Sequence, residues 1–282
     1  MDSLQIKFAQ VRDLQLQYLQ WSTTGTPLLW LPGLGHTAHI FRDIAPVFAQ
    51  RFQVLALSRR GHGKSEAPAN HDYTPQRLAD DLLEFLNVLE LQDVILVGHS
   101  IAGNEMTLAA SQQPERFKAL VYLDAAYNRS GVLKRMQQDA EHNSNASRPQ
   151  PHTLQGFRED LQAQYGCWTP ALEADLQDML IQDQGRLRLR EGPSRLFAAT
   201  DSHVPDYRSI RCPALAIYGL LEEKEDALTR KVMLPWQQES MAQFARECPL
   251  GQVIRWNTDH HFFLTEPQKT VQCLQDFLGT LQ

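Results

Sequence analysis

Residues 94–106 read VILVGHSIAGNEM, and this stretch decides the fold. Its first four residues are a continuous apolar run, which is typical of a strand that is buried on both faces. A helical pattern follows at once over residues 101–113. A serine on so sharp a strand-to-helix turn needs small residues two places before and two places after it, and Gly98 and Ala102 meet that need. The stretch therefore predicts that Ser100 is a catalytic nucleophile held on a strained turn.

The same rhythm of strand and helix extends over much of the chain. Two alternating segments open it, and short continuous apolar runs with helical patterns between them follow. The clearest helix is expected over residues 74–91, where Thr74 can cap and Pro75 suits the first turn. This order predicts an α/β fold with a mostly parallel central sheet flanked by helices. The expected strands lie near residues 4–8, 14–20, 28–31, 54–57, 94–97, 120–123, 213–218 and 252–256.

The rhythm stops after Tyr127, where the chain becomes rich in Gln, Arg, Asp and Glu. Amphipathic patterns over residues 154–165 and 170–182 indicate helices. We interpret residues 128–207 as a helical cap inserted into a core formed by residues 1–127 and 208–282.

These features resemble the α/β-hydrolase superfamily, and the likeness covers nearly all of the chain outside the insertion. Residues 31–36, LPGLGH, resemble the loop that supplies one oxyanion donor, so the resemblance implies an oxyanion hole made by the backbone N–H groups of Leu34 and Ile101. Residues 59–65, RRGHGKS, resemble a turn found in members of the superfamily, although Ser58 stands where an acid is usual. The resemblance implies that this turn braces the neighbouring loops.

The resemblance also points to a histidine base in the loop after the last strand. His260 and His261 are adjacent there. In similar enzymes this histidine often lies seven residues before a proline that opens the final helix. His260 has that spacing to Pro267, and we therefore favour His260 over His261.

Two positions can supply the acid that orients the histidine, because geometry rather than chain order defines a triad. Glu222 lies three residues past Gly219, after the strand at residues 213–218, where such enzymes most often carry an aspartate. Asp124 lies at the tip of the strand at residues 120–123, a place that some members use instead. We favour Glu222 slightly and keep Asp124 as the alternative.

A serine, a histidine and an acid indicate a hydrolase that cleaves a carboxylic ester or lactone through an acyl-enzyme. Apolar side chains of the insertion are expected to line the pocket and to favour lipophilic substrates over charged ones; they are Phe157, Tyr165, Trp168 and Phe197. The alternatives on this fold are a hydroxynitrile lyase, a haloperoxidase-like enzyme, a cofactor-free dioxygenase and a small-molecule receptor.

Composition limits the remaining possibilities. The 282 residues are 43% hydrophobic and 21% charged, with a net charge of −6 and no basic stripe, so neither nucleic acid nor an anionic membrane is expected as a partner. No apolar stretch approaches the ~18–20 residues of a membrane span. The four cysteines lack CxxC spacing, which favours reduced thiols and a cytoplasmic location. His36 and His39 have a metal-like spacing without an acidic residue nearby in the sequence, so we expect no metal site. The proposed acyl-transfer chemistry needs no cofactor. We expect the protein to be a monomer or a homodimer.

Overall fold

A central sheet of eight strands organises the molecule, in the order β1-β2-β4-β3-β5-β6-β9-β10. Strands β1, β2 and β4 pair antiparallel, and the others pair parallel, as the sequence predicted. The strands are β1 (Gln5–Val11), β2 (Leu14–Gln20), β3 (Thr26–Leu31), β4 (Phe52–Leu57), β5 (Val94–His99), β6 (Phe117–Leu123), β9 (Ala214–Gly219) and β10 (Gly251–Trp256). The computed structural model describes residues 4–131, 134, 151–200, 203–220 and 232–281.

Strand β5 explains why helices cover both faces of the sheet. Its side chains alternate, so that Val94 and Leu96 join one apolar cluster while Ile95 and Val97 join a second cluster on the opposite face. The first cluster is closed by α1 (Pro75–Val88), α2 (Ala102–Gln112) and α7 (Leu234–Glu247). The second is closed by η1 (Ala38–Phe41), η2 (Ala45–Phe48), α8 (Phe262–Thr265) and α9 (Pro267–Gly279).

Helix α1 follows the local signals of its sequence. The Thr74 hydroxyl accepts a hydrogen bond from the backbone N–H of Arg77, and Pro75 occupies the first turn. Leu78, Leu82 and the other residues of its apolar stripe are buried. The helix ends at Val88, slightly before the predicted boundary.

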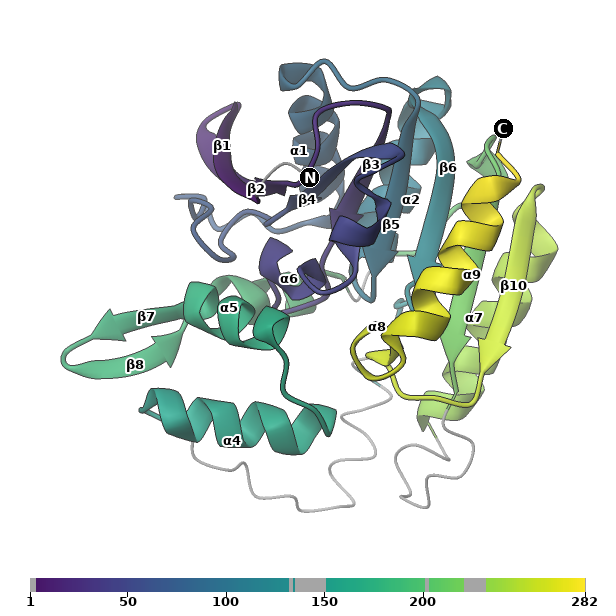
Figure 1. Cartoon of the computed structure of the whole chain (residues 1–282). Helices are drawn as coiled ribbons and strands as arrows, with labels where there is room; N and C mark the ends of the chain where they lie inside the picture. The colour runs from purple at the N-terminus through teal and green to yellow at the C-terminus, as the bar shows by residue number, and fades with distance from the viewer. Residues whose placement is uncertain (1–3, 132–133, 135–150, 201–202, 221–231, 282) are drawn as a thin grey trace.

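Residues 151–200, which belong to the segment between β6 and β9, lie beyond one end of the sheet (Figure 1). We call the described residues within 128–207 the inserted segment. Its elements are α4 (Leu154–Tyr165), α5 (Pro170–Met179), β7 (Leu180–Asp183), β8 (Arg186–Leu189) and α6 (Gly192–Thr200). The short helix η4 (Tyr207–Ser209) begins at the last residue of the inserted segment and continues into the core. The assignment of the inserted segment as a separate domain stays a prediction.

The inserted segment is not purely helical. The helix expected over residues 170–182 ends at Met179, and the chain continues into an antiparallel hairpin of β7 and β8. Gln184 and Gly185 form its turn with positive φ angles of 48° and 79°. A two-residue turn of this kind matches the right-handed twist of paired strands, which explains the hairpin. Within the ranges that the structure describes, no helix has the length and hydropathy needed to cross a membrane.

Candidate active site

Ser100 lies on the turn that joins β5 to α2. Its φ angle is 55°, in the left-handed region that few residues other than glycine adopt, and its N–H donates to the Leu123 carbonyl at 3.1 Å. A side chain at Gly98 would overlap Met106, and its Cβ would lie 3.0 Å from that of Ala102. The small residues around Ser100 are therefore a steric requirement, as the sequence predicted.

The close approach of α2 to the sheet depends on Gly103. A Cβ at this position would overlap the backbone carbonyl oxygen of Ala125, and it would lie 2.8 Å from the carbonyl carbon. A glycine is needed here because the helix that follows Ser100 contacts the chain leaving β6 with no space between them.

Ser100 and His260 are joined by a hydrogen bond. His260 Nε2 lies 2.9 Å from Ser100 Oγ, and His260 Nδ1 lies 2.5 Å from Asp124 Oδ2. An ionised carboxylate only accepts hydrogen bonds, so Nδ1 carries the proton and Nε2 is left to accept from the serine hydroxyl.

The Asp124 carboxylate is fully buried and fixed by several groups. Its Oδ1 accepts hydrogen bonds from the Gly219 N–H at 2.9 Å and from the Tyr127 hydroxyl. The Asp124 N–H donates to the Ile217 carbonyl at 2.8 Å, and its φ angle of 47° is left-handed, like that of Ser100. His99 and Leu123 are paired in register across β5 and β6, so Ser100 and Asp124 follow equivalent positions on neighbouring strands.

The structure brings His260 and Asp124 together with Ser100. His260, not His261, is the histidine that lies within hydrogen-bond distance of Ser100. His261 is packed against Tyr165, with ring centroids 4.5 Å apart, and burial lowers its pKa well below the usual value. Asp124 is the carboxylate beside His260, whereas Glu222 lies outside the described residues.

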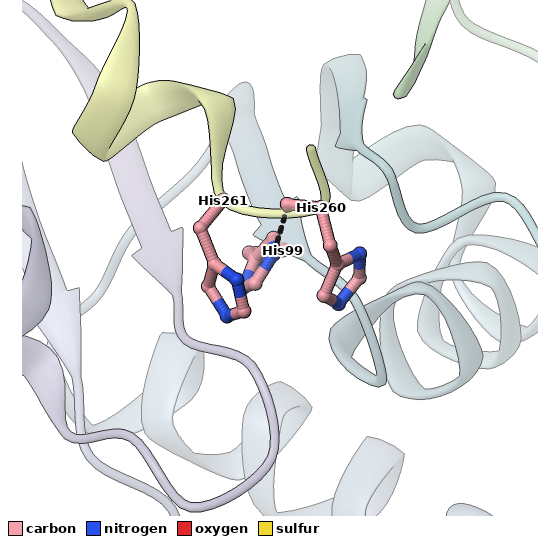
Figure 2. A group of neighbouring side chains, drawn as sticks. All are labelled: His99, His260 and His261. Atoms are coloured by element: carbon pink, nitrogen blue, oxygen red, sulfur yellow. Dashed lines mark hydrogen bonds between the residues drawn. The ribbon is translucent and has the colours of Figure 1, made fainter. Parts of the chain in front are cut away.

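His99 positions the His260 backbone through a hydrogen bond. Its Nε2–H donates to the His260 carbonyl at 3.0 Å, and Figure 2 shows the rings of His260 and His261 on either side of it. Burial lowers the pKa of His99 well below its usual value, so the ring is neutral. These three residues form the group of metal-capable side chains found in the described part of the chain. Both ring nitrogens of His260 and Nε2 of His99 already have hydrogen-bond partners, so the donor set fits a hydrogen-bond network better than a metal.

The loop after β3 lies directly against the nucleophile turn. A Cβ at Gly33 would lie 2.5 Å from His99 Nδ1 and 3.3 Å from Ser100 Cβ. Among the hydrogen bonds of the described residues, none has the N–H of Leu34 or Ile101 as its donor. Both side chains contact the apolar cluster that contains Leu196. The role of these two N–H groups as an oxyanion hole stays a prediction.

Arg59 connects the loop after β3 to helix α2. The sequence pattern predicted only that the turn at residues 59–65 braces neighbouring loops. Its Nε lies 2.6 Å from Oε1 of Glu105, on α2, and its guanidinium also donates to the carbonyls of Pro32 and Gly33. Burial raises the pKa of Glu105, and the adjacent Arg59 opposes this rise. The buried arginine therefore fixes the loop after β3 relative to α2, the helix that follows Ser100.

The inserted segment supplies acids to two histidines of the core. His36 Nδ1 lies 2.7 Å from Asp175 Oδ2, and His39 Nε2 lies 3.9 Å from Asp178 Oδ2. Both acids are remote from these histidines in the chain, so the sequence pattern around His36 and His39 does not reveal them. The Tyr165 hydroxyl lies 3.1 Å from His36 Nε2. These contacts attach the inserted segment to the loop after β3.

A cavity of about 530 Å³ lies between the inserted segment and the core. Of the predicted pocket residues, Tyr165 lines it, whereas Phe157, Trp168 and Phe197 are not among its lining residues. The cavity meets the candidate site at Leu34; Ser100 itself does not line it. Its walls are formed by Leu34, Gly35, Gly61, His62, Gly63, Leu161, Gln164, Tyr165, Met179, Arg188, Leu189, Arg190, Glu191, Pro193 and Ser194.

Comparison with known proteins decides the family. A family model described as alpha/beta hydrolase fold matches residues 26–175, more than half of the chain. This chain belongs to the alpha/beta hydrolase fold family. Such membership, together with the relatives below, supports a hydrolase activity toward a small molecule.

Two curated relatives and one solved structure illustrate the similarity within the family. The (E)-2-((N-methylformamido)methylene)succinate hydrolase of Acinetobacter baylyi is 25% identical over 91% of each chain. The uncharacterized hydrolase YugF of Bacillus subtilis is 34% identical, but the match spans only 38% of each chain. The crystal structure of E-2-(acetamidomethylene)succinate hydrolase covers 98% of this chain and all of its own, with a TM-score of 0.77 and 20% identity. This structural likeness supports the fold.

Proposed function

We propose that this protein is a serine hydrolase that cleaves a carboxylic ester or lactone with a triad of Ser100, His260 and Asp124. The observation that supports the proposal most strongly is the pair of hydrogen bonds through His260, 2.9 Å to Ser100 Oγ and 2.5 Å to Asp124 Oδ2. A nucleophile, a base and an orienting acid in this order are what acyl transfer requires.

In the proposed mechanism, Ser100 Oγ attacks the substrate carbonyl while His260 Nε2 takes the hydroxyl proton. Asp124 holds the Nδ1–H tautomer and stabilises the imidazolium that forms. The N–H groups of Leu34 and Ile101 donate to the oxyanion of the tetrahedral intermediate. The imidazolium then protonates the leaving alcohol, and a water activated by His260 releases the acid product and restores Ser100.

We assign residues 128–207 the role of a cap over the site. Ligands of open α/β sheets bind beyond the carboxyl ends of the strands, and the inserted segment lies beyond that end of β5 and β6. The cavity between this segment and the core has a volume typical of small-molecule sites.

Hydrolysis of p-nitrophenyl acetate and butyrate, followed by release of p-nitrophenol, tests the proposal. We expect multiple turnovers by the wild type and a loss on the order of 10⁵–10⁶ in kcat for Ser100→Ala. Equal turnover by Ser100→Ala would refute the mechanism. Absence of turnover in both proteins would favour a lyase, a dioxygenase or a receptor on the same fold.

A further inference from the structure

The cavity beside the candidate site has a charged wall as well as apolar surfaces. The apolar surfaces include Leu34, Leu161 and Met179. The charged residues follow one another in the chain, where β8 ends and α6 begins, and are Arg188, Arg190 and Glu191. A substrate in this cavity therefore contacts ionised side chains, contrary to the expectation of a purely lipophilic pocket.

Among the described residues, two of these three charges have partners and one does not. Arg188 Nε donates to Asp183 Oδ2 at 2.8 Å, and Glu191 Oε2 accepts from Arg195 at 3.4 Å. Arg190 makes no ion pair with any described residue, and its Nε is buried without a hydrogen-bond partner.

The other titratable side chains in the wall, His62 and Tyr165, add no charge near neutral pH, since burial raises the pKa of the Tyr165 phenol. Burial lowers the pKa of His62 to about 4, so its ring is uncharged near neutral pH. The wall as described carries one unpaired positive charge, that of Arg190. The Arg190 guanidinium lines the cavity without an anionic partner among the described residues, so an anionic ligand can gain a charge-assisted hydrogen bond from it.

The chain that carries Arg190 is held firmly against the core. A Cβ at Gly192, two residues further on, would lie 2.5 Å from the carbonyl oxygen of Gly61. The start of α6 thus contacts the turn formed by Gly61 and Gly63, which lines the same cavity. The backbone that leads from Arg190 into α6 is therefore placed against the core, which limits where the Arg190 side chain can start from.

We propose that Arg190 binds a carboxylate of the substrate, and that the preferred substrates are esters or lactones that carry a second, ionised carboxyl group. This inference rests on the proposed function. The planar guanidinium matches a carboxylate with two parallel N–H···O bonds, which favours this anion over a neutral polar group. Because the cavity includes Leu34 but not Ser100, the anion binds away from the carbonyl that is attacked.

Two methyl esters of matched chain length test the inference. Methyl butyrate ends in a methyl group where monomethyl succinate ends in a carboxylate, and both can be followed by titration of released acid at constant pH. We expect the wild type to prefer monomethyl succinate in kcat/KM. Arg190→Gln should lower kcat/KM for monomethyl succinate by about 10- to 100-fold, the range for a lost charged hydrogen bond, and change methyl butyrate by less than about threefold.

Arg186→Gln is the matched control. Arg186 begins β8, the strand that ends just before Arg190, and it is exposed and does not line the cavity. This variant removes the same net charge. It should leave the ratio of the two kcat/KM values within about twofold of the wild type. An unchanged ratio in Arg190→Gln, or an equal change in Arg186→Gln, would overturn the inference while leaving the proposed function intact.

A measurement of monomethyl succinate binding tests the role of Arg190 independently of the proposed function. If the wild type hydrolyses neither ester, the proposed function fails, and calorimetric titration of Ser100→Ala protein with monomethyl succinate decides the role of Arg190. Affinity that falls at least tenfold when Arg190→Gln is added supports the inference. Equal affinity, or no measurable binding to either protein, overturns it.

Discussion

Replacement of Asp124 by asparagine is a direct test of how His260 is oriented. The Gly219 N–H still needs an acceptor at the position of Asp124 Oδ1, so the asparagine carbonyl oxygen occupies that position. The amide NH₂ then occupies the Oδ2 position and directs an N–H toward His260 Nδ1. Nδ1 must become an acceptor and Nε2 a donor, and a protonated Nε2 cannot take the proton of Ser100.

The expected loss follows from this reversed tautomer. Serine hydrolases with the wrong histidine tautomer lose about 10⁴ in kcat, which corresponds to roughly 5 kcal/mol of transition-state stabilisation. We expect Asp124→Asn to lose about that much in kcat on p-nitrophenyl butyrate. The Ser100 hydroxyl itself is untouched, so the variant should remain more active than water alone.

Glu222→Gln is the paired variant, because Glu222 is the other acid that the sequence offers. We expect its kcat to stay within about threefold of the wild type. The reasoning is refuted if Asp124→Asn, with an unfolding temperature near that of the wild type, keeps more than a tenth of the activity. A large loss in Glu222→Gln together with that result would assign the acid to Glu222.

Three further predictions concern packing, bracing and pH. Gly103→Ala directs a methyl group onto the Ala125 carbonyl, so thermal unfolding should reveal a loss of about 3 kcal/mol or more. Arg59→Met leaves the buried Glu105 carboxylate without its partner, so urea unfolding at pH 7 should reveal a loss of about 3–5 kcal/mol, with a lower kcat as the loop after β3 loses its brace. Burial lowers the pKa of His62 from 6.5 to about 4, so the unfolded chain binds this proton first as the pH falls. His62 alone should therefore reduce the free energy of unfolding by about 2 kcal/mol between pH 7 and pH 5, and His62→Gln should remove that part of the pH dependence in urea titrations.

Controls make these three predictions decisive. Gly279→Ala adds a methyl group with nothing within 4 Å, so it should be neutral or slightly stabilising, and equal effects at both glycines would contradict the close approach at Gly103. Replacing Arg59 and Glu105 together by methionine should restore most of the stability but not the kcat. Identical pH slopes for the wild type and His62→Gln would argue against a buried neutral ring.

The fold could be predicted because its signals are local. A strand buried on both faces needs a continuous apolar run, and the run at residues 94–97 lies within β5. The cap at Thr74 and the small residues around Ser100 are likewise requirements of single turns, so they are visible in the sequence. The hairpin of β7 and β8 was missed although residues 186–190, RLRLR, alternate and follow Gln184-Gly185, because the helical pattern before it was extended too far.

The site could be predicted only in part, because several of its contacts join distant segments. Asp124 and His260 are 136 residues apart, and His36 and Asp175 are 139 residues apart. No spacing rule connects such pairs, so the acid stayed open between two candidates. The role of Arg59 was also hidden, since its partner Glu105 is defined by how α2 packs beside the loop after β3.

The pairing of β5 with β6 sets the distance between Ser100 and Asp124 independently of the inserted segment. Ser100 and Asp124 are the first residues beyond two neighbouring strands, each anchored by its N–H to the next strand in the sheet. Strands in a sheet lie ~4.8 Å apart, so backbone pairing alone sets the separation of these two residues. The inserted segment begins only after this distance is fixed. A change in its length or sequence would therefore reshape the cavity without altering the separation of Ser100 and Asp124, on which the proposed triad depends.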